Sequence, residues 1–231
     1  TPEESTNTSF GFVWDATDAL NVTFDFYSIE LEDRITQGDD ISITAADIAL
    51  LQSLGVPGAG DLTNFRFYVN DFDTTTDGFD LVATYDTEIR NGNTSFTFVY
   101  SDVSTEVDRT GGLIGSGRVD QLEKLLPGKR WNLSAVHNAG DWRFLGRMNW
   151  VDEWFTEEWG GGGGYISDMS TIDLEVSRDL GDYTLTFGAQ NAFDDHPDKE
   201  KRGLILGWEY PEASPLGFNG AFYYFKVGMD F

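Results

Sequence analysis

The chain has 231 residues, of which 40 are acidic and 15 are basic, so its formal net charge is −25 at pH 7. This surplus of negative charge repels a phosphate backbone, so nucleic acid is excluded as a partner. The absence of cysteine excludes a disulfide scaffold and a cysteine-ligated metal site. No run approaches the roughly 18 apolar residues that a membrane helix needs. Membrane-spanning strands remain compatible with the sequence, because each gives a much weaker signal.

Apolar and polar residues alternate with a period of two through most of the chain, which predicts strands with one apolar face. Between Trp142 and Trp150, for example, aromatic and other apolar residues occupy every second position. The long third strand is expected to bend or bulge between Asp73 and Gly78. The pattern predicts an all-β fold of about nine strands, at residues 7–15, 21–35, 64–89, 94–106, 130–138, 141–156, 169–179, 182–193 and 220–231.

The connections between these strands alternate strictly between short and long. Four are tight turns, and Asn91-Gly92 is a strong signal for a type I′ hairpin. The others are long, at residues 36–63, 107–129, 157–168 and 194–219. Short turns at one rim and long loops at the other are typical of a transmembrane β-barrel. A soluble sandwich has no reason to sort its loops in this way.

The apolar positions are rich in Trp, Phe and Tyr, often near strand ends, as expected of the aromatic girdles of a membrane barrel. A charged side chain that faces lipid at mid-bilayer costs about 2–4 kcal/mol, so the charged positions should face a polar lumen. A soluble barrel with an aromatic core would show the same alternation, and it remains an alternative. The predicted lumen-facing residues are Arg143, Arg147, Asp173, Glu175, Gln190 and Lys226.

The long loops contain few groups that suggest chemistry. Residues 44–55 predict a short helix that packs its loop, because a capping residue precedes it and Gly55 follows it. Gly160 to Gly164 predict a loop tip, since a phosphate cradle would need a following helix. His137 and His196 are expected at opposite rims, which disfavours a shared metal site. Acidic clusters such as Asp152-Glu153, Glu157-Glu158 and Asp194-Asp195 are interpreted as solvated loops rather than as catalytic or Ca²⁺-binding groups.

The third long loop is the best candidate for ligand contact, because exposed aromatic rings can stack on sugars or grip hydrophobic ligands. For Trp154 and Phe155, a place in the membrane-interface belt is the alternative. The candidate contacts are Trp154, Phe155, Trp159 and Tyr165.

The last strand, from Tyr223 to Phe231, ends on Phe with aromatic or apolar residues at every second place before it. It resembles the C-terminal strand of bacterial outer-membrane proteins, whose alternating pattern and terminal aromatic form the signal for the barrel-assembly machinery. In this chain the corresponding residues are Tyr223, Phe225, Val227, Met229 and Phe231.

Other motifs resemble TonB-dependent receptors in particular. Pro2-Glu3-Glu4-Ser5 is similar to the Pro-Glu-x-Ser that precedes a barrel strand in that family, and residues 20–35 look like its strand ending in Asp-Arg-Ile. Asp77 to Leu81 stand where the family has Gly-Val-Glu-Leu, with Phe79 for Val and Asp80 for Glu. Gln190 to Asp195 resemble its Asn-Leu-Phe-Asp motif, with Ala192 for Leu. The resemblance covers essentially all 231 residues.

The resemblance implies a barrel of about 22 strands, closed by a plug that is absent from this sequence. Residues 1–231 would be the C-terminal portion of that barrel, in the bacterial outer membrane. An odd number of antiparallel strands cannot close regularly, so the fragment is expected to need further strands. The implied partners are outer-membrane lipid, the remaining strands and plug, TonB through the plug, the assembly machinery, and a small-molecule or oligosaccharide ligand.

The implied function is TonB-dependent uptake of a scarce ligand, such as a siderophore, a vitamin or an oligosaccharide, with no enzymatic activity and no cofactor. Two alternatives remain. One is a passive porin-like channel with the same wall, and the other is a soluble carbohydrate-binding or hydrolytic β domain.

Overall fold

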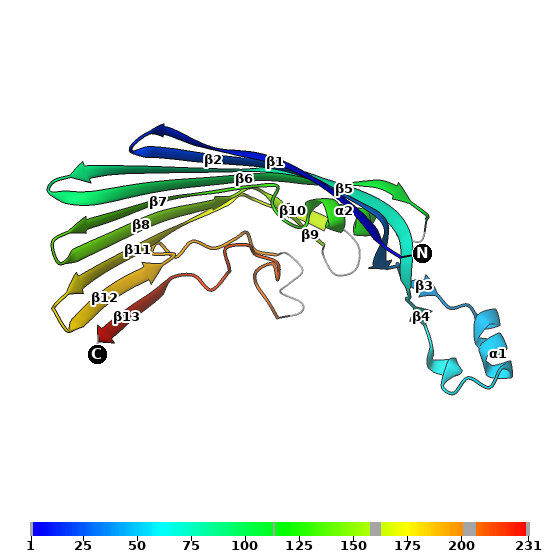
Figure 1. The fold of residues 1–231 in the computed structure, drawn as a ribbon. Helices are drawn as coiled ribbons and strands as arrows, with labels where there is room; N and C mark the ends of the chain where they lie inside the picture. Colours follow the sequence, from blue (N-terminus) through cyan, green and yellow to red (C-terminus); the bar gives the residue numbers. More distant parts are fainter. Residues whose placement is uncertain (1, 113, 158–162, 201–206, 230–231) are drawn as a thin grey trace.

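The computed structural model describes residues 2–112, 114–157, 163–200 and 207–229. Within them, nine strands form one antiparallel sheet, here called the main sheet, in the order β1-β2-β5-β6-β7-β8-β11-β12-β13 (Figure 1). The predicted all-β fold is therefore confirmed. The strands are β1 (Glu4–Thr17), β2 (Leu20–Gln37), β5 (Tyr68–Ile89), β6 (Gly92–Thr110), β7 (Lys129–Ala139), β8 (Trp142–Val151), β11 (Met169–Asp179), β12 (Tyr183–Gln190) and β13 (Phe222–Met229).

The connections are sorted by rim as the sequence predicts. Figure 1 shows the tight turns together at one end of the main sheet and the long connections together at the other. The turn between β5 and β6 is centred on Arg90 and Asn91, one residue before the predicted Asn91-Gly92 pair, and both residues have positive φ, 48° and 62°. A type I′ turn requires this conformation at its two central residues, and it matches the twist of the flanking strands.

The long connections carry the smaller elements. The first contains α1 (Ala45–Ser53), η1 (Ala59–Asp61) and a short ladder of β3 (Ile41–Ser42) with β4 (Asn64–Phe65). Thr44 and Asp47 form the capping box that begins α1, so the helix predicted for this loop is confirmed. None of the described helices is long and apolar enough to cross a membrane.

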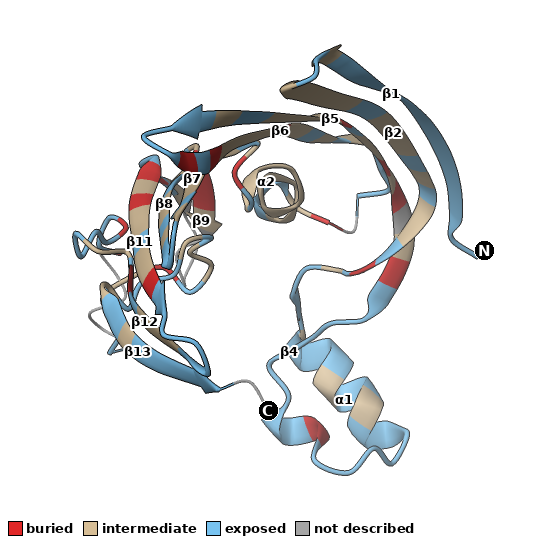
Figure 2. Cartoon of the chain, turned by 60° about the vertical axis from the view of Figure 1, so that its left-hand side comes forward, coloured by how far each residue is buried: buried red, intermediate tan, exposed pale blue. Residues whose placement is uncertain are grey.

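The second long connection contains a helix that the sequence pattern did not predict, α2 (Ser116–Lys124). Figure 2 shows the main sheet curved into an arc with α2 inside the curve. Val119 and Leu122 of α2 pack against a small cluster formed by Val69, Phe72 and Ile114. The loop therefore folds inward against the sheet.

Three of the predicted strands break or end early in the structure, and most of the others differ by a few residues at their ends. The strand predicted over 141–156 breaks after Val151, and β9 (Trp154–Glu157) pairs instead with β10 (Gly163–Ile166) in a separate hairpin. The strand predicted over 64–89 divides into β4 and β5. The strand predicted to reach residue 193 ends at Gln190, because Asn191 has a φ of 47° and leaves the ladder. Of the predicted glycine loop tip, residues 160–162 lie outside the described part of the chain.

Four strands are much longer than the rest. The strands β1, β2, β5 and β6 have 14, 18, 22 and 19 residues, whereas β13 has 8. Because β6 pairs with β7 only from Asn93 to Asp102, residues 28–37, 68–77 and 104–110 extend past the end of β7. This extension is here called the projection. Its register shifts between Asp73 and Thr74, which confirms the predicted bulge.

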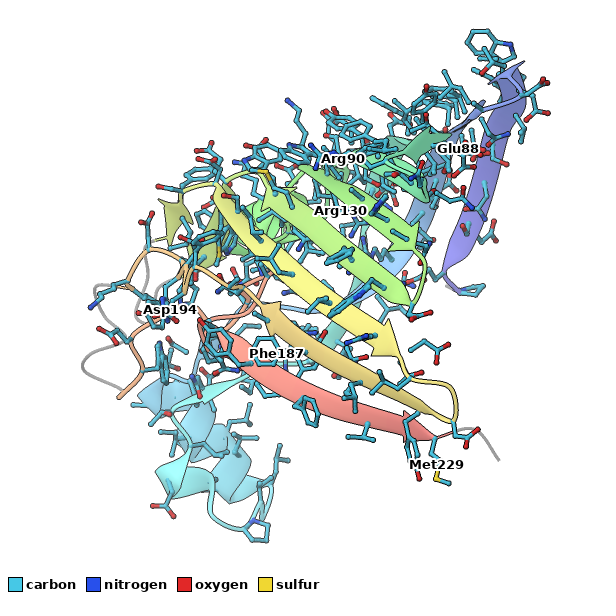
Figure 3. All side chains as sticks on the ribbon, turned by 90° about the vertical axis from the view of Figure 1, so that its left-hand side faces the viewer. Glu88, Arg90, Arg130, Phe187, Asp194 and Met229 are labelled. Carbon is cyan, nitrogen blue, oxygen red and sulfur yellow. The ribbon has the colours of Figure 1, made fainter. Side chains whose placement is uncertain are left out.

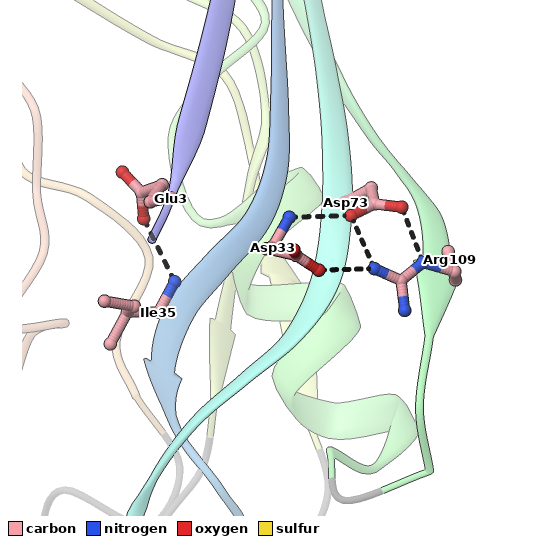
Figure 4. A network of polar contacts seen from close by, with 5 residues as sticks. All are labelled: Glu3, Asp33, Ile35, Asp73 and Arg109. Carbon is pink, nitrogen blue, oxygen red and sulfur yellow. Dashed lines mark hydrogen bonds and ion pairs between the residues drawn. The ribbon is translucent and has the colours of Figure 1, made fainter. Parts of the chain in front are cut away.

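A polar network holds this bulge together (Figure 4). Asp33 has a φ of 50°, and its backbone N–H donates to the Asp73 carboxylate at 2.9 Å. The Arg109 guanidinium binds both Asp73 oxygens, at 2.6 and 2.8 Å, and reaches Asp33 at 3.1 Å. The carboxylate of Glu3 accepts from the N–H of Ile35 at 3.0 Å. These bonds satisfy backbone groups that the shifted register would leave unpaired.

The network predicts an acid-sensitive projection. Arg109 holds the pKa of Asp73 below its usual value, as does the hydrogen bond from the Asp33 backbone. A lowered folded-state pKa gives stability that is full above the unfolded pKa of about 3.9 and is lost as the pH falls through the folded value. Hydrogen exchange of the Asp33 amide, corrected for its intrinsic pH dependence, should therefore lose protection below about pH 4. Asp73→Asn should start less protected and show no such step; an identical step in that variant would contradict the assignment.

Candidate functional site

The register of the main sheet decides which side chains share a face. Phe144 lies opposite Val176, and Arg143 lies opposite Ser177. Val151, on the same face as Arg143, packs against Trp154 of the β9–β10 hairpin, which lies on the inner side of the arc (Figure 2). The face that carries Arg143 is therefore the concave face, and the face that carries Phe144 is the convex face.

All six predicted lumen-facing residues lie on the concave face. Their positions follow from the cross-strand pairs of β8 with β11, β11 with β12, and β12 with β13. That they line a water-filled interior stays a prediction. The six are Arg143, Arg147, Asp173, Glu175, Gln190 and Lys226.

Glu175 is the centre of a charged cluster on this face. Its carboxylate accepts from Nη1 of Arg143 at 2.8 Å and from the Tyr224 hydroxyl at 2.7 Å. The ammonium group of Lys226 lies 3.6 Å from the same carboxylate. These partners come from β8 and β13, so the side chains of three strands meet in the cluster, which reaches across the intervening β12. A carboxylate with this many partners is held in one geometry.

Asp173 has a different role from Glu175, because it connects the wall to the long segment after β12. It accepts from Nδ2 of Asn149 at 3.0 Å and from the backbone N–H of Asn191 at 2.9 Å. The Asn191 side chain in turn binds both backbone groups of Asp195, at 2.7 and 3.0 Å. The Asn-Ala-Phe-Asp segment is therefore a turn that leads the chain from the wall into the loop.

The convex face is apolar and strongly aromatic. One row of rings runs from Phe12 through Phe24 and Phe79 to Tyr100, with centroids 5.6, 5.6 and 5.7 Å apart. Trp131 stacks on Trp150 at 6.2 Å beside this row. The rings are not gathered into a dry centre, since they lie along the outside of the arc. Large apolar side chains here are exposed in the isolated chain, among them Phe144, Met148, Leu174 and Phe187.

The apolar surface ends at this ring row. On β5 the convex positions are apolar from Tyr85 to Phe79 and then change to Asp77 and Thr75. On β6 they change after Tyr100, to Asp102 and Ser104. The apolar stretches of these two convex rows, residues 79–85 and 96–100, therefore end well before the strands themselves do. The projection carries polar residues beyond it.

The four predicted ligand contacts do not form an exposed ring. Trp154 is fully buried and Phe155 nearly so, which corrects the expectation that these rings are available to a ligand or to the membrane interface. They are buried because β9 folds inward, where Ile166, Met169 and Leu216 cover Trp154. Tyr165 is 55% exposed and remains accessible. Trp159 lies outside the described residues.

Another aromatic site was not anticipated from the sequence. Trp208, Tyr210 and Phe218 line a pocket of about 510 Å³ together with Glu209 and Glu212. The same segment reaches the concave face, because Leu216 packs beside Val151. Aromatic residues interspersed with Gly and Pro between residues 207 and 220 were the available signal, but a strand pattern does not detect them.

The two histidines and Asp194, candidates from the sequence for a metal site, each contact other residues of the chain. His137 lies beside a tight turn and bonds with the Thr94 hydroxyl at 2.8 Å, whereas His196 stacks on Tyr210 in the segment after β12. Asp194 accepts from the backbone N–H of Ala221 at 2.8 Å. Among the residues that the structure describes, no group of three potential ligands could hold a metal ion.

Four residues of the predicted assembly signal share the convex face of β13. Tyr223, Phe225, Val227 and Met229 lie opposite Ala189, Phe187, Leu185 and Tyr183 of β12. Phe187 and Met229 are labelled on their strands in Figure 3. Phe231 lies outside the described part of the chain.

An antiparallel sheet with an aromatic convex face, a charged concave face and loops sorted by rim is the wall of an outer-membrane type of β-barrel. The sequence matches the family model described as TonB dependent receptor-like, beta-barrel, over residues 1–192. The chain therefore belongs to the TonB-dependent receptor-like β-barrel family.

Solved structures share the fold at low sequence identity. The outer membrane transporter YddB from Escherichia coli aligns with 99% of this chain and 33% of its own, at 12% identity and a TM-score of 0.67. The copper transporter OprC aligns with 100% and 32%, at 16% identity and a TM-score of 0.62. The ferric citrate transporter FecA, unliganded, aligns with 84% and 27%, at 21% identity and a TM-score of 0.57. This chain thus spans about a third or less of those proteins. A search of curated proteins finds no match.

The orientation of the two faces is testable with adjacent residues. Leu133 lies on the convex face opposite Met148, and Asn132 lies on the concave face opposite Asn149. Leu133→Arg should cost about 2–4 kcal/mol because its charge enters hydrocarbon. Asn132→Arg should cost much less, because its charge enters water.

The measurement is the yield of folded, heat-modifiable barrel in the outer membrane for the full receptor that contains this chain. Equal yields for the two variants, or the reverse order, would contradict the assignment of the faces.

Proposed function

We propose that this chain is part of the wall of a receptor in the bacterial outer membrane that takes up a scarce ligand with energy delivered through TonB. Family membership supports the proposal. The observation that carries it is the division of the sheet into an aromatic convex face and a charged concave face centred on Glu175. Such a division fits a wall between lipid and a polar interior.

The two edge strands of the main sheet indicate which partners the chain needs. Within the described residues, β1 and β13 each pair on one side only. Unpaired backbone groups are costly in hydrocarbon, so both edges need further strands of the parent protein. The assembly machinery would recognise β13, and TonB would act through the plug. The chain itself supplies wall and loops, with no covalent chemistry and no cofactor.

The ligand classes that we propose are a metal complex such as a siderophore, a vitamin, or an oligosaccharide. Similar folds include transporters named for ferric citrate and for copper. Contact would come from the exposed Tyr165 and from the pocket of Trp208, Tyr210 and Phe218. Flat rings beside carboxylates suit a ligand with apolar faces and hydroxyl or cationic groups.

Energy dependence separates the receptor from a passive channel. Uptake of isotope-labelled ferric citrate, copper, cobalamin and a maltodextrin would be measured in cells with and without the receptor. For at least one probe, receptor-dependent uptake should be lost when TonB is deleted or the proton gradient is collapsed. Receptor-dependent uptake that continues unchanged without TonB would identify a porin-like channel. A monodisperse, cooperatively melting protein without detergent would contradict the barrel itself.

The aromatic pocket predicts a loss of affinity on truncation. Trp208→Ala removes an exposed ring of the pocket and should raise the half-saturating concentration of the transported probe roughly tenfold, about 1.4 kcal/mol. Trp14→Ala, which removes a somewhat more exposed ring from the convex face near a tight turn, should leave that concentration unchanged. If the two variants changed the half-saturating concentration equally, the pocket would not be a ligand-binding site.

A further inference from the structure

The convex face has an open, apolar depression in its second half. A cavity of about 610 Å³ opens there across β7, β8, β11 and β12, and its lining is almost wholly apolar. Its floor is formed by small residues and its sides by large ones. The floor residues are Ala135, Gly146 and Ala189, and the sides are Phe144, Leu174 and Phe187.

The depression exists because Gly146 has no side chain. Ala135 lies directly opposite Gly146 on β7, and Leu174 lies opposite it on β11. A Cβ at Gly146 would find only Cδ2 of Leu174 within 4 Å, at 3.9 Å, so the space above the glycine is open. A larger residue would fit there and would fill the depression. Elsewhere on this face, from Phe12 to Tyr100, stacked rings form a continuous surface.

A cation stands at one end of the depression. Phe144 stacks on Trp142 with centroids 6.0 Å apart, and the guanidinium of Arg178 lies 4.9 Å from the Trp142 ring centroid. Arg178 pairs directly with Trp142 and so shares the convex face. Among the residues that the structure describes, Arg178 forms no ion pair, although Asp179 is its neighbour in sequence. The Asp179 carboxylate accepts instead from the N–H of Gly181.

The place of Arg178 in β11 shows how deep in the membrane its side chain lies. It is the last residue but one of β11, directly before a tight turn. The rim of short turns faces the periplasm in outer-membrane barrels. Arg178 therefore lies at the level of the headgroups of the periplasmic leaflet, and the depression extends from it into the apolar band. An apolar groove in line with an interfacial cation matches a lipid with a phosphate at one end and a hydrocarbon chain at the other.

We propose that this groove binds one phospholipid of the periplasmic leaflet, with an acyl chain over Gly146 and the phosphate at Arg178. The site goes beyond the proposed uptake function and shares with it only the assignment of the convex face to lipid. A bound lipid would fill a gap in the packing of the wall, where loose hydrocarbon would otherwise make poor contact.

Native mass spectrometry of the full receptor tests the site. The purified, folded receptor would be titrated in detergent with phosphatidylglycerol and phosphatidylethanolamine. The wild type should retain one lipid more tightly than any further lipids. Gly146→Leu should reduce the affinity of that first lipid at least about fivefold, close to 1 kcal/mol. Ala83→Leu, which adds the same bulk on the convex face of β5, should leave it unchanged.

Arg178→Gln changes only an exposed side chain and tests the headgroup separately, whether or not Gly146→Leu folds. It should weaken binding of both lipids, since both carry the phosphate. First-lipid affinities in Arg178→Gln that equal those of the wild type would overturn the proposal, as would an equal loss in Ala83→Leu and Gly146→Leu. Because folding and uptake are measured on the same variants, a receptor that transports but shows no preferred lipid refutes this site alone.

Discussion

The structure depends on one constraint: each strand of the main sheet places alternate side chains in two different surroundings. A period of two sends Phe144 to the convex face and Arg143 to the concave face, and the cross-strand register carries the same division from β1 to β13. Because neighbouring strands are in register, a slip of one residue would turn a whole strand around and place charges among the rings. The aromatic row and the Glu175 cluster both follow from this alternation.

The curvature gives the concave face room for the loops. The loop with α2 and the hairpin of β9 and β10 fold into the arc, and they bury Phe72 and Trp154 in two small clusters. The apolar packing of this chain is therefore loop against wall. Among the described residues, no second layer of the chain covers the convex face, which is the opposite of a soluble sandwich, where the apolar faces of two sheets cover each other.

The sequence predicted those features that depend only on residues near one another in the chain. Alternation and turn residues predicted the strands, a tight turn after β5 and the sorting of the rims, because each depends on residues close together in the chain; the centre of that turn was predicted one residue too late. The bulge at Asp73 was also predicted, from the unusual length of its strand. The inward fold of β9 was missed, since Trp154 continues the alternation of β8 and only its burial by Ile166 and Met169 shows where it goes. The site at Trp208 was missed for a related reason, because irregular backbone has no period to detect.

The two halves of the wall differ in a way that bears on mechanism. The strands β1, β2, β5 and β6 continue into the projection, which Arg109 and Asp73 fasten at the bulge. The strands β7 to β13 end near the level of the ring row, and the segment after β12 folds back toward the concave face through Asp173 and Leu216. One side is thus an extended wall and the other a shorter wall covered by loops. A ligand arriving from outside would meet the projection first and the aromatic pocket of Trp208 afterwards, so capture and entry would be served by different parts of the same chain.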